Sequence, residues 1–166
     1  ARAGGVRYPS FLYHIADRGL QDVADSLTAI RKVIFDDQKM TVKQLLEAMD
    51  ADFEGYEYER ALLKAAPKYG NDDDYADAIF DDLSVWLQNR MYHEKNPFGT
   101  PLWAGRSGAM AHVTFGRKTG PLPNGHKSGE PIADGFCSPS QGCDTHGPTC
   151  VFNSASKAVH VMNSTA

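Results

Sequence analysis

One irregular stretch, residues 123–157, is rich in side chains that could do chemistry: it carries Cys137, Cys143, Cys150, His126 and His146. Thiolates and imidazoles are the usual ligands of zinc in proteins, and structural zinc sites generally contain paired ligands two to four residues apart. No C-x-x-C pair occurs in this chain. The spacing therefore does not favour a metal site.

A reactive thiol is the second chemistry that this stretch allows. Cys143 is followed closely by Asp144 and His146, and a nucleophilic cysteine needs a base together with a group that orients the base. The alternative is a set of buried, unreactive thiols. We favour the inert thiols, since three cysteines without a secretory segment are typical of a reducing compartment.

The same stretch contains many glycines and prolines and no regular helical pattern until its end. Glycine allows positive φ and proline fixes φ, so such a segment follows one particular irregular path. Apolar side chains are spread through this stretch, at Ile132, Phe136 and Val151. We predict a packed loop of fixed shape, because long irregular loops in compact proteins usually serve function.

Composition excludes several classes of protein. The chain has 166 residues, of which 42% are hydrophobic and 23% charged, as in one globular domain. Its net charge of −4 gives no basic surface for nucleic acid, and no apolar run approaches the length of a membrane span. Without a signal segment, a cytoplasmic location is the expectation.

The first half of the chain is expected to consist of helices, which would position the cysteines and histidines of residues 123–157. Apolar residues recur at three- and four-residue intervals from Leu20 to Phe35, which predicts an amphipathic helix. Its apolar stripe would consist of Leu20, Val23, Ala24, Leu27, Ile30 and Ile34. Thr41 and Gln44 form a capping box for a second helix. That helix is expected to bury Val42, Leu45, Leu46 and Met49.

A third helix is predicted from Tyr56 to Ala66, ended by Pro67, and a fourth from Tyr75 to Arg90. The run of acidic residues between them, 72–74, suggests calcium, but it lacks the alternating ligands and the glycine of an EF-hand loop. Acidic side chains at a helix N-terminus explain it more simply.

A strand is expected within Trp103 to Gly116, whose later half alternates in polarity. Small residues crowd this segment, and a glycine in a strand, such as Gly105, often marks the close approach of a ligand or of another backbone. A tightly packed strand beneath a helix is the alternative interpretation.

Several ordered motifs resemble glycyl radical enzymes. They are GG-x-x-Y and DVADSL-x-AI-x-K near the start, DFEGY and PKYGNDDDY in the middle, and PNG-x-K-x-GEP-x-ADG, SP-x-QG-x-D-x-x-GPT and NS-x-SK near the end. The resemblance covers nearly all of the chain. It implies an α/β fold, in which helices of the first half and a strand plus loop of the second half belong to a barrel of about ten strands.

The resemblance also implies a site. The segment after GG-x-x-Y runs beside the active cavity in this family, so Phe11 and Ile15 are expected in its wall. The barrel strand would add Gly105, Ser107 and Ala109 as substrate-binding positions. His126, Lys127 and Glu130 carry charge within the loop, and we expect them to hold the loop in place rather than to contact substrate.

The cofactor implied is a glycyl radical, installed by an activating enzyme that uses S-adenosylmethionine and an iron–sulfur cluster. Neither the Gly-Cys-Val-type motif of the radical-relaying cysteine nor the Arg-Val-x-Gly-Tyr-type motif of the radical glycine occurs in this sequence. We therefore interpret residues 1–166 as an internal fragment of one catalytic domain, inactive by itself and not expected to fold alone. No catalytic residue and no metal ligand is assigned within it.

Within the family, the segment from Phe136 to His160 looks closest to the fumarate-adding branch, the alkylsuccinate and benzylsuccinate synthases. Small side chains at Ser107 and Ala109 would leave room for a hydrocarbon that adds to fumarate. Small accessory subunits and a homodimer are the partners that this branch implies. The alternatives are a diol dehydratase or decarboxylase of the same family, or a non-enzymatic metal-binding module.

Overall fold

The computed structural model describes residues 14–16, 18–97, 99, 101–105, 110–135 and 137–158 of the chain. This part is mostly helical. In chain order its elements are β1 (His14–Ala16), α1 (Leu20–Ala29), η1 (Ile30–Asp36), α2 (Val42–Asp50), α3 (Glu57–Ala65), α4 (Asp74–His93), β2 (Trp103–Gly105), α5 (Ala111–Gly116) and α6 (Pro148–Lys157). The ten-stranded barrel itself stays a prediction, since only two short strands lie among the described residues.

The first predicted helix is confirmed, and its second half, η1, is a π-helix that continues α1 without a break. The prediction of its buried stripe is partly wrong. Leu20 and Ala24 are buried, but Val23 and Leu27 are 48% and 43% exposed, and Asp22 and Asp25 are buried instead. Periodicity locates an apolar face but does not say what covers it. Here the inner face packs on a loop whose amide groups need acceptors.

The second helix begins at the predicted capping box. The backbone amide of Gln44 donates to Thr41 Oγ1, and the backbone amide of Thr41 donates to Gln44 Oε1. Leu45 is buried and Met49 partly so, whereas Val42 and Leu46 are 50% and 55% exposed, which corrects the expected stripe. The capping pattern is local and therefore visible in sequence, but burial depends on distant segments.

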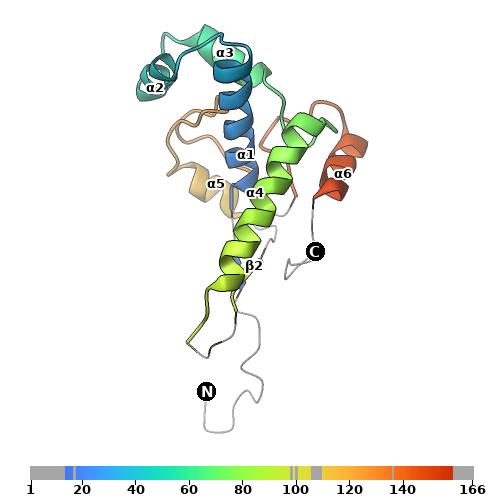
Figure 1. Ribbon diagram of the computed structural model, residues 1–166. Coiled ribbons are helices and arrows are strands. Elements are labelled where there is room, and N and C mark those ends of the chain that lie inside the picture. Colours follow the sequence, from blue (N-terminus) through green and yellow to red (C-terminus); the bar gives the residue numbers. More distant parts are fainter. Residues whose placement is uncertain are drawn as a thin grey trace.

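The next two helices also agree with the prediction. α3 ends before Pro67, and α4 begins at Asp73, whose side chain accepts from the Tyr75 amide. The acidic run therefore caps a helix, as expected. α4 lies alongside α1, and α6 packs beside the start of α4 (Figure 1).

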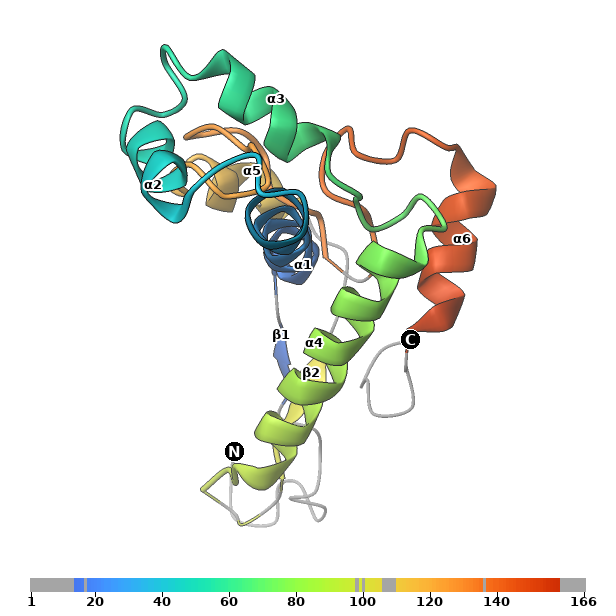
Figure 2. The same ribbon diagram turned by 45° about the horizontal axis from the view of Figure 1, so that its top comes forward.

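The segment from Trp103 to Gly116 contains less strand than predicted. Only Trp103–Gly105 is extended, and Ala111–Gly116 is the short helix α5. A short alternating run cannot be distinguished from a helix by its period alone. β2 pairs with β1 in parallel, with Ile15 opposite Ala104 and Ala16 opposite Gly105, and the two strands lie side by side in Figure 2.

Two apolar clusters stabilise the helices. The first joins α1, η1, α2 and α3 through Ala29, Val33, Met40, Leu45, Ala48, Phe53, Leu63 and Ala66. The second joins α1, α4 and the long loop through Leu20, Ala24, Tyr69, Phe80, Cys137 and Ala158. Cys137 therefore packs as a small apolar side chain. With Ile132 and Ala133 also buried, the stretch predicted as a packed loop does contribute to the core.

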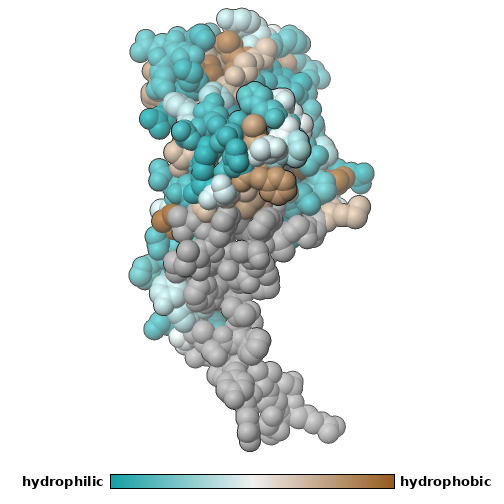
Figure 3. Space-filling view, turned by 90° about the vertical axis from the view of Figure 1, so that its right-hand side faces the viewer, coloured by the Kyte–Doolittle hydropathy of each residue, from teal (hydrophilic) through white to brown (hydrophobic). Residues whose placement is uncertain are grey.

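The α6 side of the molecule is mostly hydrophilic, with apolar side chains in separate groups (Figure 3). Some large apolar side chains are nevertheless well exposed, including Phe152 on α6 at 74% and Trp86 on α4 at 61%. None of the helices that the structure describes combines the length and hydrophobicity that a membrane span requires.

Candidate functional site

The carboxyl ends of β1 and β2 form the frame of the site. β1 leads into α1 through Gly19, whose φ of 78° is readily adopted only by glycine, and β2 is followed by α5. Because the strands are parallel, their carboxyl ends lie at the same edge of the pair. In open parallel sheets, ligands usually bind beside this edge.

A single loop segment, residues 130–134, crosses between the two helix starts. The Ala133 amide donates to Asp22 Oδ2 of α1 at 2.7 Å, and the Ile132 amide donates to the His112 carbonyl of α5 at 3.4 Å. Asp134 Oδ1 lies 2.7 Å from His112 Nδ1. Adjacent residues of one loop thus contact the first turn of each helix.

The turn before this segment is held by α3. Arg60 Nε donates to the Gly125 carbonyl at 2.8 Å, and its Nη2 contacts Glu130 Oε1 at 3.0 Å. The Lys127 amide donates to Glu130 Oε2, and His126 Nε2 lies 2.8 Å from the Glu130 carbonyl. Burial alone would raise the pKa of Glu130, but the Lys127 amide and Arg60 hold it below its usual value. These contacts support the holding role that the sequence predicted for His126 and Glu130.

Asp25 of α1 joins two further segments. Its Oδ1 accepts from the Tyr69 amide at 2.8 Å, and its Oδ2 accepts from Ser140 Oγ at 2.7 Å. The side chain is fully buried. Burial raises the pKa of Asp25 to about 6, against the lowering effect of Ser140, the Tyr69 amide and Lys68. The carboxyl group thus fixes the loop on α1 at a second point.

The side chain of Asn71 binds the next part of the loop through both its nitrogen and its oxygen. Its Nδ2 donates to the Cys143 carbonyl at 2.7 Å, and its Oδ1 accepts from the amides of Thr145 and His146 at 2.9 and 3.1 Å. The motif that contains Asn71, PKYGNDDDY, is therefore in direct contact with the motif that contains Thr145, SP-x-QG-x-D-x-x-GPT.

α6 is anchored on the start of α4 in the same way. Ser154 Oγ donates to Asp77 Oδ2 at 2.9 Å and accepts from the Asp72 amide. Lys157 Nζ lies within 2.9 Å of three carboxylates, those of Asp72, Asp74 and Asp77, and these contacts raise its pKa. The NS-x-SK motif thus binds the acidic run that precedes α4.

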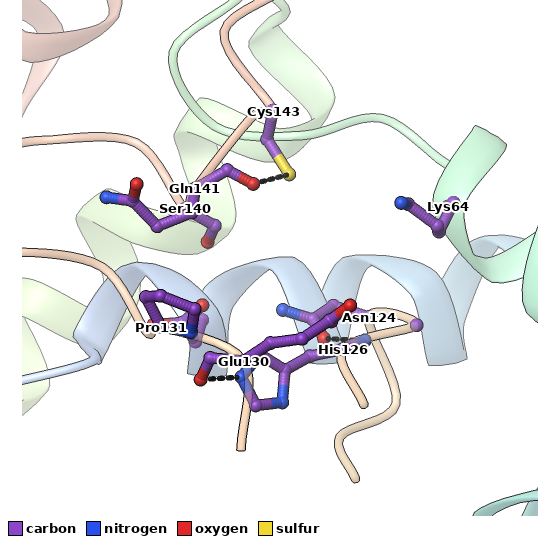
Figure 4. A pocket seen from close by; sticks show the side chains of 10 residues that line it. Lys64, Asn124, His126, Glu130, Pro131, Ser140, Gln141 and Cys143 are labelled. Atoms are coloured by element: carbon purple, nitrogen blue, oxygen red, sulfur yellow. Dashed lines mark hydrogen bonds between the residues drawn. The ribbon is translucent and has the colours of Figure 1, made fainter. Parts of the chain in front are cut away.

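A cavity of about 230 Å³ lies between the two halves of the loop. Ser140, Gln141 and Cys143 lie on one side of it, and Asn124, His126, Glu130 and Pro131 on the other, with Lys64 at one end (Figure 4). Asp22 completes the lining of the cavity. Burial raises the pKa of Asp22, although the hydrogen bond from the Ala133 amide acts in the opposite direction. The polar groups of its wall are engaged mainly with the loop's own backbone. We therefore regard the cavity as part of the loop framework.

The cysteine arrangement differs from a nucleophilic site. His146 Nδ1 lies 3.2 Å from the Asn71 carbonyl, and Cys143 Sγ donates to the Gln141 carbonyl at 3.9 Å. The three thiols are free. Among the residues that the structure describes, no group of three His, Cys, Asp or Glu side chains is placed to hold a metal ion.

Cys143 is therefore expected to alkylate slowly. Burial, helped by Asp25, raises the pKa of its thiol to about 11, so on the order of 100-fold less thiolate is present at pH 8 than for a thiol of pKa 9. Iodoacetamide labelling followed by mass spectrometry should show a rate that rises about tenfold per pH unit from pH 8 to 10. Labelling at pH 8 as fast as that of a small free thiol would contradict this result.

The predicted wall positions are only partly within the described residues. Ile15 lies in the middle of β1 and Gly105 at the end of β2, so the pairing brings both to one sheet. Phe11, Ser107 and Ala109 lie outside the described residues. Sequence reasoning missed Asp22, His112 and Asp134. The available signal was the pair of carboxylates in DVADSL, Asp22 and Asp25, which lie beside the predicted apolar stripe of this helix.

This chain is similar to known proteins over most of its length. The model of the "pyruvate formate lyase-like" family matches residues 1–116. The isethionate sulfite-lyase of Desulfovibrio desulfuricans is 43% identical over 136 residues, which cover 80% of this chain and 16% of that protein. The trans-4-hydroxy-L-proline dehydratase of Clostridioides difficile is 38% identical over 159 residues, which cover 95% of this chain and 20% of that protein.

A solved structure agrees with these relatives. The glycerol-bound B12-independent glycerol dehydratase of Clostridium butyricum superposes with a TM-score of 0.83 at 38% identity, over 92% of this chain and 20% of that one. The chain thus spans about a fifth of the length of the proteins it matches. These relatives eliminate water or sulfite, and this favours the dehydratase alternative over the fumarate-adding branch that we expected from the loop.

Proposed function

Because the chain belongs to the pyruvate formate lyase-like family of glycyl radical enzymes, we propose that it is a segment of a glycyl radical lyase that eliminates water or another leaving group from a small polar substrate. Identity of 38–43% to a dehydratase and a sulfite-lyase, over most of the chain, is the observation that carries this proposal. The expected hydrocarbon addition to fumarate has no such support.

The family implies the glycyl radical and its activating enzyme, and both belong to the proposal. The radical, relayed through a cysteine, would supply the abstraction of a hydrogen atom from a substrate carbon, which activates a leaving group on the neighbouring carbon. Neither radical motif lies in this sequence. The barrel, the homodimer, the accessory subunits and the cytoplasmic location remain predictions from the resemblance and the composition.

The residues of this chain would form part of the wall of the reaction cavity. β1 and β2 would present Ile15 and Gly105 there, with Phe11, Ser107 and Ala109 as the other proposed contacts. A substrate radical must be kept away from water and from stray hydrogen donors, and it must be held in one orientation. A loop held on the first turns of α1 and α5, the helices that follow the two strands, suits that task.

The test uses the full-length protein that carries this segment, activated without oxygen by its activating enzyme. Electron paramagnetic resonance should detect a glycyl radical. Glycerol, trans-4-hydroxy-L-proline and isethionate, the compounds named for the relatives above, are offered one at a time, and toluene with fumarate is offered in parallel. We expect turnover of at least one of the first three without fumarate. Conversion only of toluene with fumarate would disprove elimination and restore the hydrocarbon hypothesis.

A further inference from the structure

Two carboxyl groups of α1 are buried against the same loop. Asp22 and Asp25 are three residues apart and therefore lie on one face of the helix. Asp22 Oδ2 accepts from the Ala133 amide at 2.7 Å, and Asp25 Oδ2 accepts from Ser140 Oγ at 2.7 Å. The two acidic residues are 3% and 0% exposed, so bulk water contributes little to satisfying their oxygen atoms.

Ser140 connects the two carboxyl groups. Its buried hydroxyl donates to Asp25, and a hydrogen bond also joins its side chain to that of Asp22. A hydroxyl has one hydrogen and can donate only once. If both carboxyl groups were ionised, the oxygen of Asp22 that meets Ser140 would therefore face a lone pair. One proton supplies the missing hydrogen, because the hydroxyl can then accept from one carboxyl group while it donates to the other.

The charges that face the two carboxyl groups do not replace this proton. Burial raises the pKa of both, that of Asp25 to about 6, although the charge of Lys68 acts against it at Asp25 and the ring of His126 acts against it at Asp22. Lys68 Nζ also donates to two backbone carbonyls, at 2.7 and 2.8 Å. The thiol of Cys143, whose pKa burial raises to about 11, adds no charge near neutral pH.

The proton can reach this group from solvent. Asp22 and Ser140 line the cavity of about 230 Å³ between the two halves of the loop, which is partly open, and Figure 4 shows Ser140 on one of its walls. One water molecule needs only about 15 Å³ of such a cavity, so several fit. The charge of Lys64, at one end of the cavity, acts on the Cys143 thiol.

We propose that Asp22, Ser140 and Asp25 hold one proton in common and that this proton stabilises the contact of the loop with α1, so that the loop is held more firmly in acid than in base. The sign follows from the pKa of Asp25, which is about 6 in the folded protein and 3.8 ordinarily. The stabilisation is complete below about pH 4 and is lost as the pH rises through 6. It operates whatever reaction the whole enzyme catalyses, so its failure and that of the proposed elimination are separate results.

Hydrogen exchange in the full-length protein, without radical activation, measures this dependence. The amides of Tyr69 and Ala133 donate to Asp25 and Asp22, so their exchange reports the opening of each contact. After correction for the pH dependence of exchange in unfolded peptides, both amides should be about tenfold less protected at pH 8 than at pH 5.

The slope of this dependence counts the protons. The logarithm of the protection should fall by no more than one unit per pH unit, because one proton is involved. A slope near two would mean that the carboxyl groups bind two separate protons, and equal protection at pH 5 and pH 8 would mean that they bind none. Either result overturns the proposal.

Asparagine at either position supplies a permanent hydrogen and should remove the dependence. Asp22→Asn keeps an oxygen for the Ala133 amide and offers its own amide to Ser140 Oγ, so that Asp25 no longer needs the proton. The protection of Tyr69 should then differ less than twofold between pH 5 and pH 8, and Asp25→Asn should have the same effect on Ala133. If Tyr69 keeps the tenfold dependence in Asp22→Asn, Asp25 binds its proton alone and the proposal fails.

Two further variants test the hydroxyl. Ser140 lowers the pKa of both carboxyl groups, so Ser140→Ala should keep the pH dependence and move its midpoint upward by about half a pH unit or more. Asp82→Asn, at an exposed position of α4, is the matched control and should keep the wild-type midpoint. A midpoint that does not move in Ser140→Ala contradicts the shared hydroxyl. Peptides of α4 report unfolding of the whole protein, and where a variant unfolds, the slope in the wild type decides.

Discussion

An Asp25→Leu protein is expected to be about 3 kcal/mol less stable around α1 than an Asp25→Asn protein, although leucine is the more apolar side chain. Asp25 is fully buried and accepts from the Tyr69 amide and from Ser140 Oγ. Leucine would leave both donors unpaired in the interior, at a cost of about 1–3 kcal/mol for each group. Asparagine keeps an oxygen for the Tyr69 amide and offers its own amide to the Ser140 hydroxyl.

Hydrogen exchange measures this difference locally. The amide of Tyr69 should exchange about 100-fold faster in Asp25→Leu than in Asp25→Asn, which corresponds to the difference of about 3 kcal/mol. The peptide containing Tyr69 is followed by mass spectrometry in the full-length protein. Equal protection in the two variants would show that the carboxylate does not hold this segment.

The same residue gives a pH dependence of defined sign. The pKa of Asp25 is about 6 in the folded protein and 3.8 ordinarily, so the folded state binds the extra proton between these values. Stability relative to Asp25→Asn should therefore be greatest below about pH 4 and fall as the pH rises through 6, by about 3 kcal/mol in total. Burial also raises the pKa of Asp22, so Asp22 changes stability in the same direction. The charge of Lys68 lowers the pKa of Asp25 and so opposes the effect of its burial. A flat difference between the two proteins from pH 4 to 8 contradicts this account.

The helices were predictable because their signals are local. The capping box at Thr41, the stop at Pro67 and the acidic cap at Asp73 each involve residues within a few positions of one another. These signals fix where a helix begins and ends. They do not fix which face is buried, and this is why Val23 and Leu27 were assigned to the interior while Asp22 and Asp25 were not.

The contacts of the site could not be predicted, because they join residues that are far apart in the sequence. The contact between Asp22 and Ala133 spans 111 positions of sequence, and that between Asp25 and Ser140 spans 115. Nothing in either segment alone shows that an acid of one helix is the acceptor for an amide of the loop. The loop could be recognised as ordered from its glycines and apolar residues, but its partners could not.

The resemblance identified the family, whereas the comparisons favour a different branch from the one that the loop suggested, and the structure offers a reason. The motifs that carried it contact one another. Asn71 of NDDD binds the Cys143 carbonyl of SP-x-QG-x-D, and Ser154 and Lys157 of NS-x-SK bind Asp72 of NDDD. Ser140 of SP-x-QG-x-D binds Asp25 of DVADSL. They build the framework that any member with this loop requires. Framework residues report the fold, whereas substrate choice depends on wall residues, and these are few in this chain.

Gly116→Ala is expected to destabilise the protein by about 3 kcal/mol, against the usual preference of helices for alanine. A Cβ at Gly116 would lie 2.2 Å from the Glu130 carbonyl oxygen and 2.7 Å from Pro131 Cα. Both are backbone atoms, so no side-chain rotation relieves the overlap, and residues 130–131 must move away from α5. The Ala133–Asp134 pair lies directly after them and would move too. We therefore expect kcat/KM of the full-length enzyme to fall at least tenfold.

Gly120→Ala is the matched control, because no atom lies within 4 Å of the position that its Cβ would take. Its melting temperature and kcat/KM should equal those of the wild type, while those of Gly116→Ala fall. The comparison isolates the contact between α5 and the loop, since both variants add the same methyl group a few residues apart. If Gly116→Ala melts with the control and keeps full activity, the loop is not packed against α5 as described, and the contact of residues 130–133 with both α1 and α5 loses its physical basis.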